Sequence, residues 1–352
     1  MPPPLHVVHC DFGRSWRGGQ QQLLLLAREL QRLEWRQTII APAAAVARRF
    51  TAEGFAVLPA GIPGGLRTRQ ADIVHAHDGR ALGWCLGWRA LRPAAGVVFS
   101  RRVAFPLRSR LTLWKLHRTG RIIAVSHFVR EQLVSAGMHA DHVMVVHDGV
   151  EGELLQPDGN LATREPIRQQ WQLPPATVCL VSLSALSPEK GVPDLVAALA
   201  DLPASVHLVL GGEGGLRAAI EQRSRALGVR HRLHWAAGGI PAADLLQAGD
   251  IFVLPSHQEG LGSSVLLAHA LRRPVVATRV GGVPEIVSDE STGLLVAPGQ
   301  PAALAAAVRR LIRDPLLAAQ LTACGWDQVQ SDFSSARMAA LTDQVYRRQL
   351  AV

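Results

Sequence analysis

The sequence predicts an α/β protein of two doubly wound domains, each a parallel sheet covered by helices on both faces. The chain is 352 residues long and 48% hydrophobic, which is enough for two cores. Short apolar runs alternate with helical patterns almost from end to end, which is typical of βαβ units. A polar segment with many glycine and proline residues, 147–176, interrupts the alternation and predicts a linker.

The first half contains short apolar runs that we predict to be parallel strands. They are residues 5–9, 37–41, 55–58, 71–75, 96–100, 121–125 and 142–146. Amphipathic segments lie between them, including GQQQLLLLAREL and SHFVREQLVSAG, where Ser126 is placed as an N-cap. We place the first domain at residues 1–160.

The second half repeats the pattern. Strands are predicted near residues 177–183, 204–210, 232–235, 250–254, 274–278 and 292–296, with helices near 193–200, 214–227, 241–248 and 263–271. After Pro301 only helical patterns remain. We therefore place the second domain at 161–332 and expect the amphipathic segment 333–352 to be a closing helix.

The charge and cysteine content restrict the partners and the compartment. A net charge of +9 and a pI near 10.7 suit nucleic acid, an anionic membrane surface or a phosphorylated substrate. No known nucleic-acid-binding motif is present, so we expect no nucleic-acid partner. Four cysteines without a CxxC pair argue against zinc and disulfides. Because the start lacks a signal-peptide pattern and no apolar run reaches about 18 residues, we expect a soluble cytoplasmic protein.

Two glycine-rich turns follow predicted strands, where ligands bind in doubly wound sheets. Gly18 and Gly19 precede a helix and would let a phosphate approach the backbone and the free N–H groups of the helix. A flexible connection is the alternative, and no GK[ST] follows as in a Walker A loop. Gly212 lies in GGEGG, which departs from the dinucleotide fingerprint at Arg217, so we interpret it as a tight turn near a ligand.

Lys190 and Glu259 each follow a predicted strand of the second half. Lys190, in SPEKG, lies near a helix start and opposes the helix dipole, so an anion there would pair with it; a solvated lysine is the alternative. In PSHQEGLGSSVLLAHA, Gly260 and Gly262 form the turn.

Ser263 or Ser264 is predicted to cap the helix that follows this turn. Glu259 is then not needed as a cap, which favours a contact with a ligand.

Residues 101–121 form a basic segment without an acidic residue. Apolar side chains are interleaved with the cations: Leu111, Leu113, Trp114 and Leu116. The pattern indicates a surface for anionic lipid or for a phosphorylated acceptor, and a solvated basic face is the alternative.

Taken in order, these motifs resemble the retaining glycosyltransferase family 4, whose members have the GT-B fold of two facing Rossmann-like domains. The matching stretches are RGGQQQLLLLARELQRL, ADIVHAH, IIAVSHFVREQLVSAG, VMVVHDGVE, SPEKG and the run from DIFVLPSHQEGLGSSVLLAHA to LVAPGQPAALAAAV. In that family a closing helix crosses back to the N-terminal domain, which implies the same for 333–352.

The resemblance implies roles for these residues. Glu259 would bind hydroxyls of the transferred sugar, and Lys190 the diphosphate. The implied catalytic residues are Glu259, Lys190 and Arg102. The implied donor-binding residues are Gly18, Gly19, Arg101, Lys190, Gly212, Glu259, Gly260, Leu261, Gly262, Ser263, Ser264 and Glu285. Neither a metal nor a cofactor is expected, because preorganised N–H groups and a cation stabilise the charge on the leaving group.

Three positions depart from the family pattern. Leu267 stands where a second acid commonly binds the ribose, and Glu285 is a candidate replacement. Ala185 stands where an arginine often shares the diphosphate. Where many members have a histidine after strand 96–100, this chain has Arg101 and Arg102, either of which would face the sugar or the phosphate.

The function that the resemblance implies is transfer of a sugar from a nucleotide-diphosphate sugar to a lipid-linked or cell-surface glycan, in lipopolysaccharide or exopolysaccharide assembly. The basic segment 101–121 would rest on the inner face of the cytoplasmic membrane. The alternatives are a degenerate sugar-nucleotide-binding module without turnover, a sugar-nucleotide epimerase of the same fold and, more distantly, a nicotinamide-dependent oxidoreductase.

Overall fold

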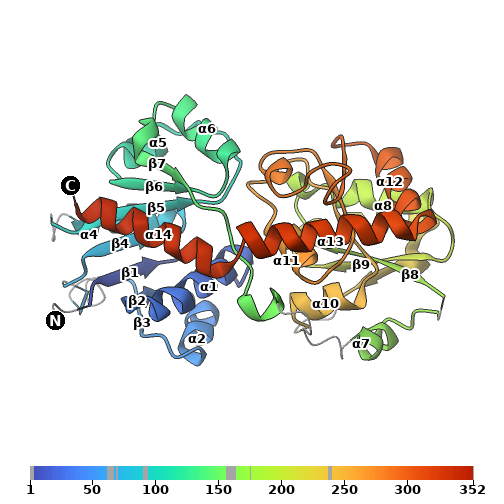
Figure 1. The fold of residues 1–352 in the computed structure, drawn as a ribbon, viewed down its shortest axis with the longest axis horizontal. Helices are drawn as coiled ribbons and strands as arrows, with labels where there is room; N and C mark the ends of the chain where they lie inside the picture. Colours follow the sequence, from blue (N-terminus) through green and yellow to red (C-terminus); the bar gives the residue numbers. More distant parts are fainter. Residues whose placement is uncertain are drawn as a thin grey trace. The chain divides into compact units, whose positions relative to one another are not determined.

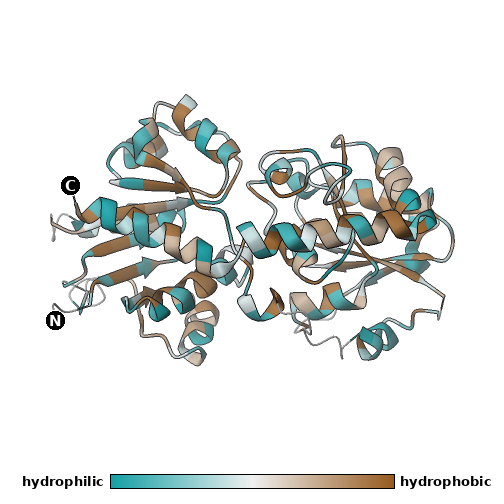
Figure 2. Ribbon diagram, in the orientation of Figure 1, coloured by the Kyte–Doolittle hydropathy of each residue, from teal (hydrophilic) through white to brown (hydrophobic). Residues whose placement is uncertain are grey.

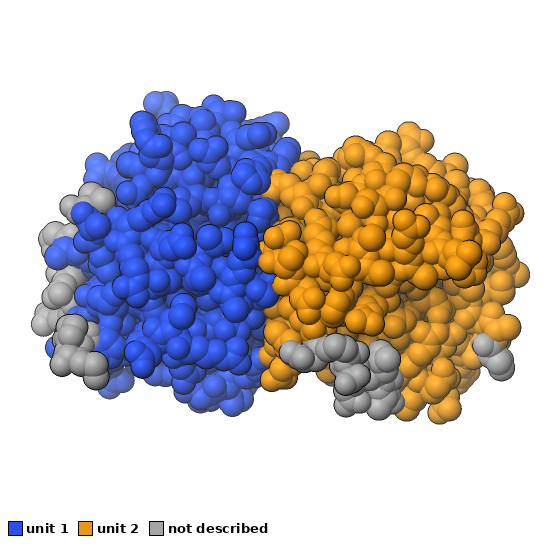
Figure 3. All heavy atoms as spheres, in the orientation of Figure 1, with its two compact units in different colours: residues 1–149, 334–352 blue, residues 150–333 orange. Residues whose placement is uncertain are grey.

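A computed structural model describes residues 4–61, 67–68, 70–89, 94–155, 164–174, 176–236 and 240–351. The chain divides into two compact units, Met1–Gly149 with Ser334–Val352, and Val150–Phe333 (Figures 1 and 3). The first boundary therefore lies at 149/150, earlier than the predicted 160/161 but inside the polar segment 147–176. The C-terminal helix belongs to the N-terminal unit.

The N-terminal unit is built on a parallel sheet that, among the described residues, has seven strands. These are β1 (His6–Cys10), β2 (Arg36–Ile40), β3 (Val57–Leu58), β4 (Ile73–Ala76), β5 (Gly96–Arg101), β6 (Arg121–Ala124) and β7 (Val143–Val145). Their order is β3-β2-β1-β4-β5-β6-β7, and in the register of β1 with β4, His9 lies opposite His75. Every strand predicted in the first half is confirmed, with ends shifted by one or two residues.

Helices cover both faces of this sheet. They are α1 (Gly18–Arg32), α2 (Ala44–Ala52), α4 (Gly79–Arg89), α5 (Arg110–His117), α6 (His127–Ser135) and, from the far end of the chain, α14 (Ser335–Leu350). The side chain of Ser126 accepts a hydrogen bond from the N–H of Val129 at 3.1 Å, which confirms it as the N-cap of α6.

Helix α14 completes the core of the N-terminal unit beside α1. It alternates hydrophobic and hydrophilic residues (Figure 2), and its apolar side packs with strands β1, β4, β5 and β6. Tyr346 is fully buried, and its hydroxyl lies 2.6 Å from Nδ1 of His75. The Trp35 indole donates to Asp343 at 2.8 Å. These contacts attach the C-terminal end of the chain to the N-terminal sheet.

The C-terminal unit repeats the architecture. Its described strands are β8 (Val178–Leu183), β9 (Val206–Gly211), β10 (Leu233–Trp235), β11 (Ile251–Leu254), β12 (Val275–Thr278) and β13 (Leu294–Val296), in the order β10-β9-β8-β11-β12-β13. The helices are α7 (Arg164–Gln170), α8 (Val192–Ala200), α9 (Arg217–Ala226), α10 (Ala242–Ala248), α11 (Ser263–Ala270), α12 (Pro301–Arg313) and α13 (Pro315–Asp332). The predicted strands and helices of this half are confirmed.

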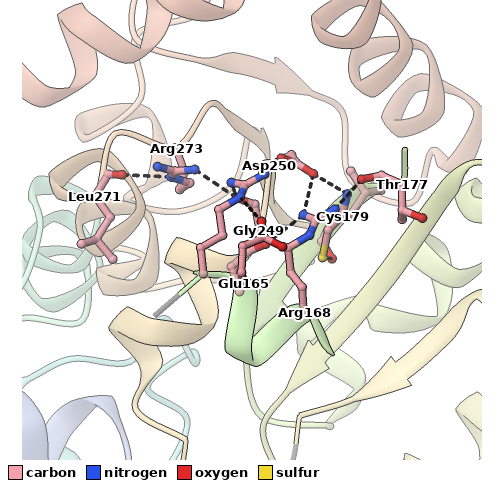
Figure 4. Close-up of polar contacts among 11 residues, drawn as sticks. Glu165, Arg168, Thr177, Cys179, Gly249, Asp250, Leu271 and Arg273 are labelled. Carbon is pink, nitrogen blue, oxygen red and sulfur yellow. Dashed lines mark hydrogen bonds and ion pairs between the residues drawn. The ribbon is translucent and has the colours of Figure 1, made fainter. Parts of the chain in front are cut away.

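Asp250 holds α7 against the C-terminal sheet (Figure 4). Its carboxylate accepts from the Cys179 backbone N–H at 2.7 Å and from Arg168 at 3.1 Å, and it pairs with Arg164. Burial raises the pKa of Asp250, but the Cys179 N–H and the two guanidinium groups outweigh burial and leave the pKa below its usual value. The carboxylate is therefore ionised at neutral pH and joins α7, β8 and the start of β11.

Candidate active site

Each sheet reverses its direction of strand growth at one point, where doubly wound folds bind ligands beyond the carboxyl ends of the strands. In the C-terminal unit this point lies between β8 and β11, and in the N-terminal unit between β1 and β4. The loop after β8 carries Lys190 and the loop after β11 carries Glu259. The loop after β1 leads to Gly18 and Gly19. The sequence-predicted residues thus lie at both switch points.

Lys190 and Glu259 meet, although 69 residues separate them in the sequence. Lys190 Nζ donates to Glu259 Oε2 at 2.8 Å, and Ser256 Oγ donates to the same oxygen at 3.1 Å. The two charged side chains keep 21% and 14% of their surface exposed. A cation and an oxygen acceptor, both partly desolvated, therefore lie at the C-terminal switch point.

Glycines let the loops of this site pack backbone against backbone. Gly191 has φ of +60°, and a Cβ there would lie 2.0 Å from the Pro255 carbonyl oxygen. Gly281 has φ of +53°, and a Cβ there would lie 1.8 Å from the Glu259 carbonyl oxygen. Only glycine suits both the conformation and the space. The sequence analysis did not single out either residue as part of the site, although both lie in Gly-containing turns after strands.

Helix α11 begins beside Glu259, but its cap differs from the prediction. The N-cap is Gly262 in a left-handed conformation, without a side-chain cap hydrogen bond, and Ser263 is the first helical residue. The prediction of a Ser263 or Ser264 cap is wrong because the Gly262 turn starts the helix one residue earlier. Leu261 is buried, with 2% exposure. The first turn of α11 still directs backbone N–H groups away from the helix at this end.

The GGEGG turn packs against the loop that carries Lys190. A Cβ on Gly212 would lie 1.9 Å from the Ser184 carbonyl oxygen, and one on Gly214 would lie 2.3 Å from that of Leu186. The N–H of Leu186 also donates to the Glu213 carbonyl at 2.9 Å. Loop packing thus explains these glycines, and contact of Gly212 with a ligand stays a prediction.

The family departures lie near the same loops. Leu267 is half-buried on α11, and Ala185 is half-buried between β8 and Lys190. Glu285 is half-buried at the end of the short 3-10 helix Val283–Glu285, which follows Gly281. Its role as a replacement ribose ligand stays a prediction.

In the N-terminal unit, Gly18 and Gly19 are the first two residues of α1, and a Cβ on either would meet nothing within 4 Å. Gln20 accepts from the Arg17 backbone N–H at 3.1 Å and donates to Asp11 at 2.9 Å. Burial raises the pKa of Asp11 at the end of β1. The open space over the two glycines is compatible with close approach of a ligand.

The two adjacent arginines after β5 have different surroundings. Arg101 is buried and donates to the Phe105 carbonyl, and burial lowers its pKa. Arg102 Nε donates to Asp148 Oδ1 at 3.1 Å, and its Nη1 donates to His77 Nδ1 at 3.2 Å. Of the pair, Arg101 therefore fixes its own loop, whereas Arg102 lies at the carboxyl edge of the sheet among polar groups.

The sequence analysis did not assign a role to His9 on β1, to His75 on β4 or to His77, which directly follows β4. His9, His75 and His77 are buried at the N-terminal switch point. Burial lowers the pKa of His9 to about 3, and burial followed by the neighbouring histidines and Arg102 lowers the pKa of His75 and His77 well below its usual range. All three are neutral at pH 7. The available signal was the histidine near the end of HVVHC together with the alternating pair in IVHAH.

The basic segment 101–121 is only partly exposed. Leu116 is buried in the unit, whereas Leu111 and Trp114 on α5 have 62% and 51% of their surface exposed. The Arg118 guanidinium lies 4.7 Å from the centre of the Trp114 ring. Among the described helices, none has the length and apolar character to cross a bilayer.

Two family models match the chain, one in each half. "Glycosyltransferase Family 4" matches residues 16–154, and "Glycosyl transferases group 1" matches residues 163–325. Two parallel-sheet Rossmann-like units with these domains define the class of GT-B glycosyltransferases. This chain belongs to the glycosyltransferase family that carries the family 4 and group 1 domains.

Curated relatives are bacterial glycosyltransferases. The putative teichuronic acid biosynthesis glycosyltransferase TuaC of Bacillus subtilis is 30% identical over 64% of this chain and 55% of its own length. The lipopolysaccharide core biosynthesis glycosyltransferase LpsD of Rhizobium meliloti is 32% identical over 50% of each chain. A glycogen synthase of Mycobacterium tuberculosis is 29% identical over 84% of this chain and 74% of its own length. For TuaC and LpsD the match spans only about half of the relative.

Solved structures share the fold along the whole chain. Anabaena HepE in complex with UDP and glucose superposes with a TM-score of 0.88 at 20% identity, covering 98% of this chain and all of that one. WaaG, a glycosyltransferase involved in lipopolysaccharide biosynthesis, superposes with a TM-score of 0.73 at 16% identity, covering 96% and 99%. The GT-B fold is therefore confirmed.

Proposed function

We propose that this protein is a retaining glycosyltransferase that moves a sugar from a nucleoside-diphosphate sugar to a lipid-linked or cell-surface glycan. The observation that carries the proposal is the contact of Lys190 with Glu259 at the switch point of the C-terminal sheet, beside the first turn of α11. A cation and the backbone N–H groups at a helix N-terminus suit a diphosphate, and a carboxylate suits sugar hydroxyls. The family 4 and group 1 domains agree with this chemistry.

In the proposed reaction the bond between the sugar carbon and the diphosphate oxygen breaks, and a bond from the acceptor hydroxyl oxygen to that carbon forms on the same face. The acceptor proton moves to the leaving phosphate, so no protein nucleophile is assigned. Lys190 and the N–H groups of residues 260–264 stabilise the charge that develops on the leaving group. Gly18, Gly19 and Arg102 are assigned to substrate oxyanions. With cations in these roles we expect no metal requirement.

Donor binding must separate Lys190 from Glu259, because the two side chains are assigned to different parts of the donor. In the proposed complex Lys190 turns to phosphate oxygen and Glu259 to sugar hydroxyls. We expect Glu259→Gln to bind the free nucleoside diphosphate at least as tightly as the unaltered protein, because Lys190 loses its internal partner. Transfer should fall by about a hundredfold or more, because the lost interaction is with the reacting sugar.

The test is a thermal-shift and transfer series with the full chain, beginning with UDP, GDP, ADP and CMP and their sugar conjugates. A donor at about 100 times its Kd should stabilise the fold by roughly 2.7 kcal/mol. Lys190→Ala should remove that stabilisation, and Lys115→Ala, which alters the other lysine of the chain, should not.

Binding without transfer or donor hydrolysis would favour the alternative of a sugar-nucleotide-binding module, for which Leu267 and Ala185 are the motivation. If no nucleotide shifted the melting curve, the proposal would fail.

We further propose that α5 rests on an anionic membrane, where the acceptor would be embedded. The support is the exposure of Leu111 and Trp114 beside Arg110 and Arg118, without an acidic residue in 101–121. Sedimentation with phosphatidylserine vesicles should decrease in Trp114→Ala and in Arg110→Glu, and stay unchanged in Leu316→Ser, which alters an equally apolar residue with 85% exposure on α13. Equal binding to neutral vesicles would contradict a role for the cations.

A further inference from the structure

The buried histidines of the N-terminal unit lie close enough together to hold a metal ion, but most of their ring nitrogens already take part in hydrogen bonds that a metal would have to displace. One ligand atom from each of His9, His75 and His77 lies within 4.8 Å of the others. However, Arg102 donates to His77 at 3.2 Å, and both ring nitrogens of His9 and of His77 already have hydrogen-bond partners. A cation bound there would displace these bonds and lie against a guanidinium, so the cluster is better explained by its hydrogen bonds.

The direction of these hydrogen bonds follows from Arg102, at one end of the series. Arginine only donates, so Nδ1 of His77 must accept from Arg102. A neutral His77 then carries its proton on Nε2, and this N–H donates to Nδ1 of His9 at 3.0 Å. His9 in turn carries its proton on Nε2 and donates to Oε1 of Gln37 at 3.2 Å.

Gln37, at the other end of this series of hydrogen bonds, gives the same direction independently. The Ala27 carbonyl only accepts, and Nε2 of Gln37 donates to it at 2.8 Å. The amide oxygen of Gln37 therefore faces His9, which must donate. Because a donor-only group and an acceptor-only group fix the two ends, one pair of tautomers satisfies every bond.

We infer that His77 and His9 are positioning residues: as neutral Nε2–H tautomers they form, with Gln37, a one-directional hydrogen-bond chain that holds the Arg102 guanidinium beside Asp148. Arg102 has two of its nitrogens in these bonds, and its Nη2 has no hydrogen-bond partner among the described residues. That nitrogen is assigned to a substrate oxyanion, and this part of the inference rests on the proposed function.

The surroundings of His9 and His77 keep both imidazoles neutral. His9 and His77 are buried, and a second proton on either ring would point an N–H at another donor. Asp148 is the carboxylate that balances the charge of Arg102, at 3.1 Å. The charge therefore stays on Arg102, at the end nearest the carboxyl edge of the sheet.

The first experiment measures the tautomers without any turnover. Long-range proton–nitrogen spectra of the full chain labelled with ¹⁵N-histidine should show, at pH 7, that the imidazoles of His9 and His77 both have a protonated Nε2 and an unprotonated Nδ1. His9→Gln and His77→Gln assign them by loss of signal. A protonated Nδ1 or an imidazolium at either position would overturn the inference.

The second experiment tests whether His77 acts through Arg102. His77→Leu should lower kcat/KM by about tenfold to a hundredfold, as for other residues that orient a ligating group. His77→Gln should recover most of it, since its amide can accept from Arg102 and donate to His9. In an Arg102→Gln background, His77→Leu should change kcat/KM by less than about twofold. If the effects of the two substitutions on kcat/KM multiplied instead, the inference would be contradicted.

A matched control is His6→Leu, which removes a buried histidine at the opposite end of β1. It should lower stability but leave both tautomers and kcat/KM unchanged. If the unaltered protein showed no transfer at all, the proposed function would fail, while the spectra would still decide whether the chain exists.

Discussion

At the scale of single residues, two glycines with similar backbone angles have different surroundings. Gly281 and Gly299 both have positive φ, +53° and +69°. A Cβ on Gly281 would lie 1.8 Å from the Glu259 carbonyl oxygen, whereas one on Gly299 would meet nothing within 4 Å. The first position therefore combines backbone strain with a collision at the candidate site, and the second has strain alone.

We expect Gly281→Ala to lower the free energy of unfolding by about 2–4 kcal/mol and to reduce activity, because the Glu259 backbone must move. Gly299→Ala should cost only about 1–2 kcal/mol and leave activity unchanged. Urea unfolding of both variants measures the difference. Equal costs would mean that the loop around Glu259 adapts without strain.

At Gly19 we expect a substitution to change stability and activity in opposite directions. It lies in the first turn of α1 with open space around it, so alanine there should keep or raise stability, by up to about 1 kcal/mol. If a phosphate approaches this backbone, the added methyl group should raise the KM for the donor severalfold. Unfolding and initial-rate measurements on Gly19→Ala check both effects, and an unchanged KM would remove Gly19 from the site.

At the scale of elements, the attachment of α7 should depend on pH through Asp250. The folded pKa of Asp250 is depressed, so its stabilisation is fully present above the unfolded pKa of about 3.9 and is lost as pH falls through the folded value. At pH 7, Asp250→Asn should lower the free energy of unfolding by about 2–4 kcal/mol, because Arg164 and Arg168 lose their partner.

The difference between Asp250→Asn and the unaltered protein should shrink below pH 4. Urea unfolding at several pH values measures it. A difference that stays constant down to pH 3 would show that hydrogen-bond geometry, rather than charge, stabilises α7.

The predicted elements were reliable because local periodicity is strong in this chain. Residues 178–183 and 206–211 are mainly apolar runs, each with one polar residue, Ser182 and His207, as expected of strands that are buried on both faces. The helix cap at Ser126 was also readable from the sequence, since a serine precedes the amphipathic run. The cap of α11 was not, because the left-handed turn at Gly262 competes with two serines that follow it.

At the scale of the whole molecule, the two units differ in continuity along the chain. The C-terminal unit is one continuous stretch, 150–333, whereas the N-terminal unit needs residues from both ends. Helix α14 contributes Met338, Ala339, Val345 and Tyr346 to the core beside α1. Removing that helix would expose the apolar side of the sheet.

We expect a fragment of residues 150–333 to unfold cooperatively on its own, and a fragment of residues 1–149 to lack a cooperative transition. A peptide of residues 334–352 should restore that transition when added in excess. Circular dichroism during urea unfolding tests each case. A cooperative transition of 1–149 alone would show that α14 is dispensable for the N-terminal core.

The sequence by itself determined the two sheets, the order of elements and the loops that hold the candidate residues, because these follow from local hydrophobic periodicity and turn chemistry. Tertiary structure alone decided which groups meet. Lys190 reaches Glu259 across 69 residues, and His9 reaches His77 across 68. Arg101 and Arg102 are adjacent, yet only the second bonds to Asp148 and His77. Successive side chains at the end of a strand point to opposite faces, and only the packed neighbours decide which face binds a ligand.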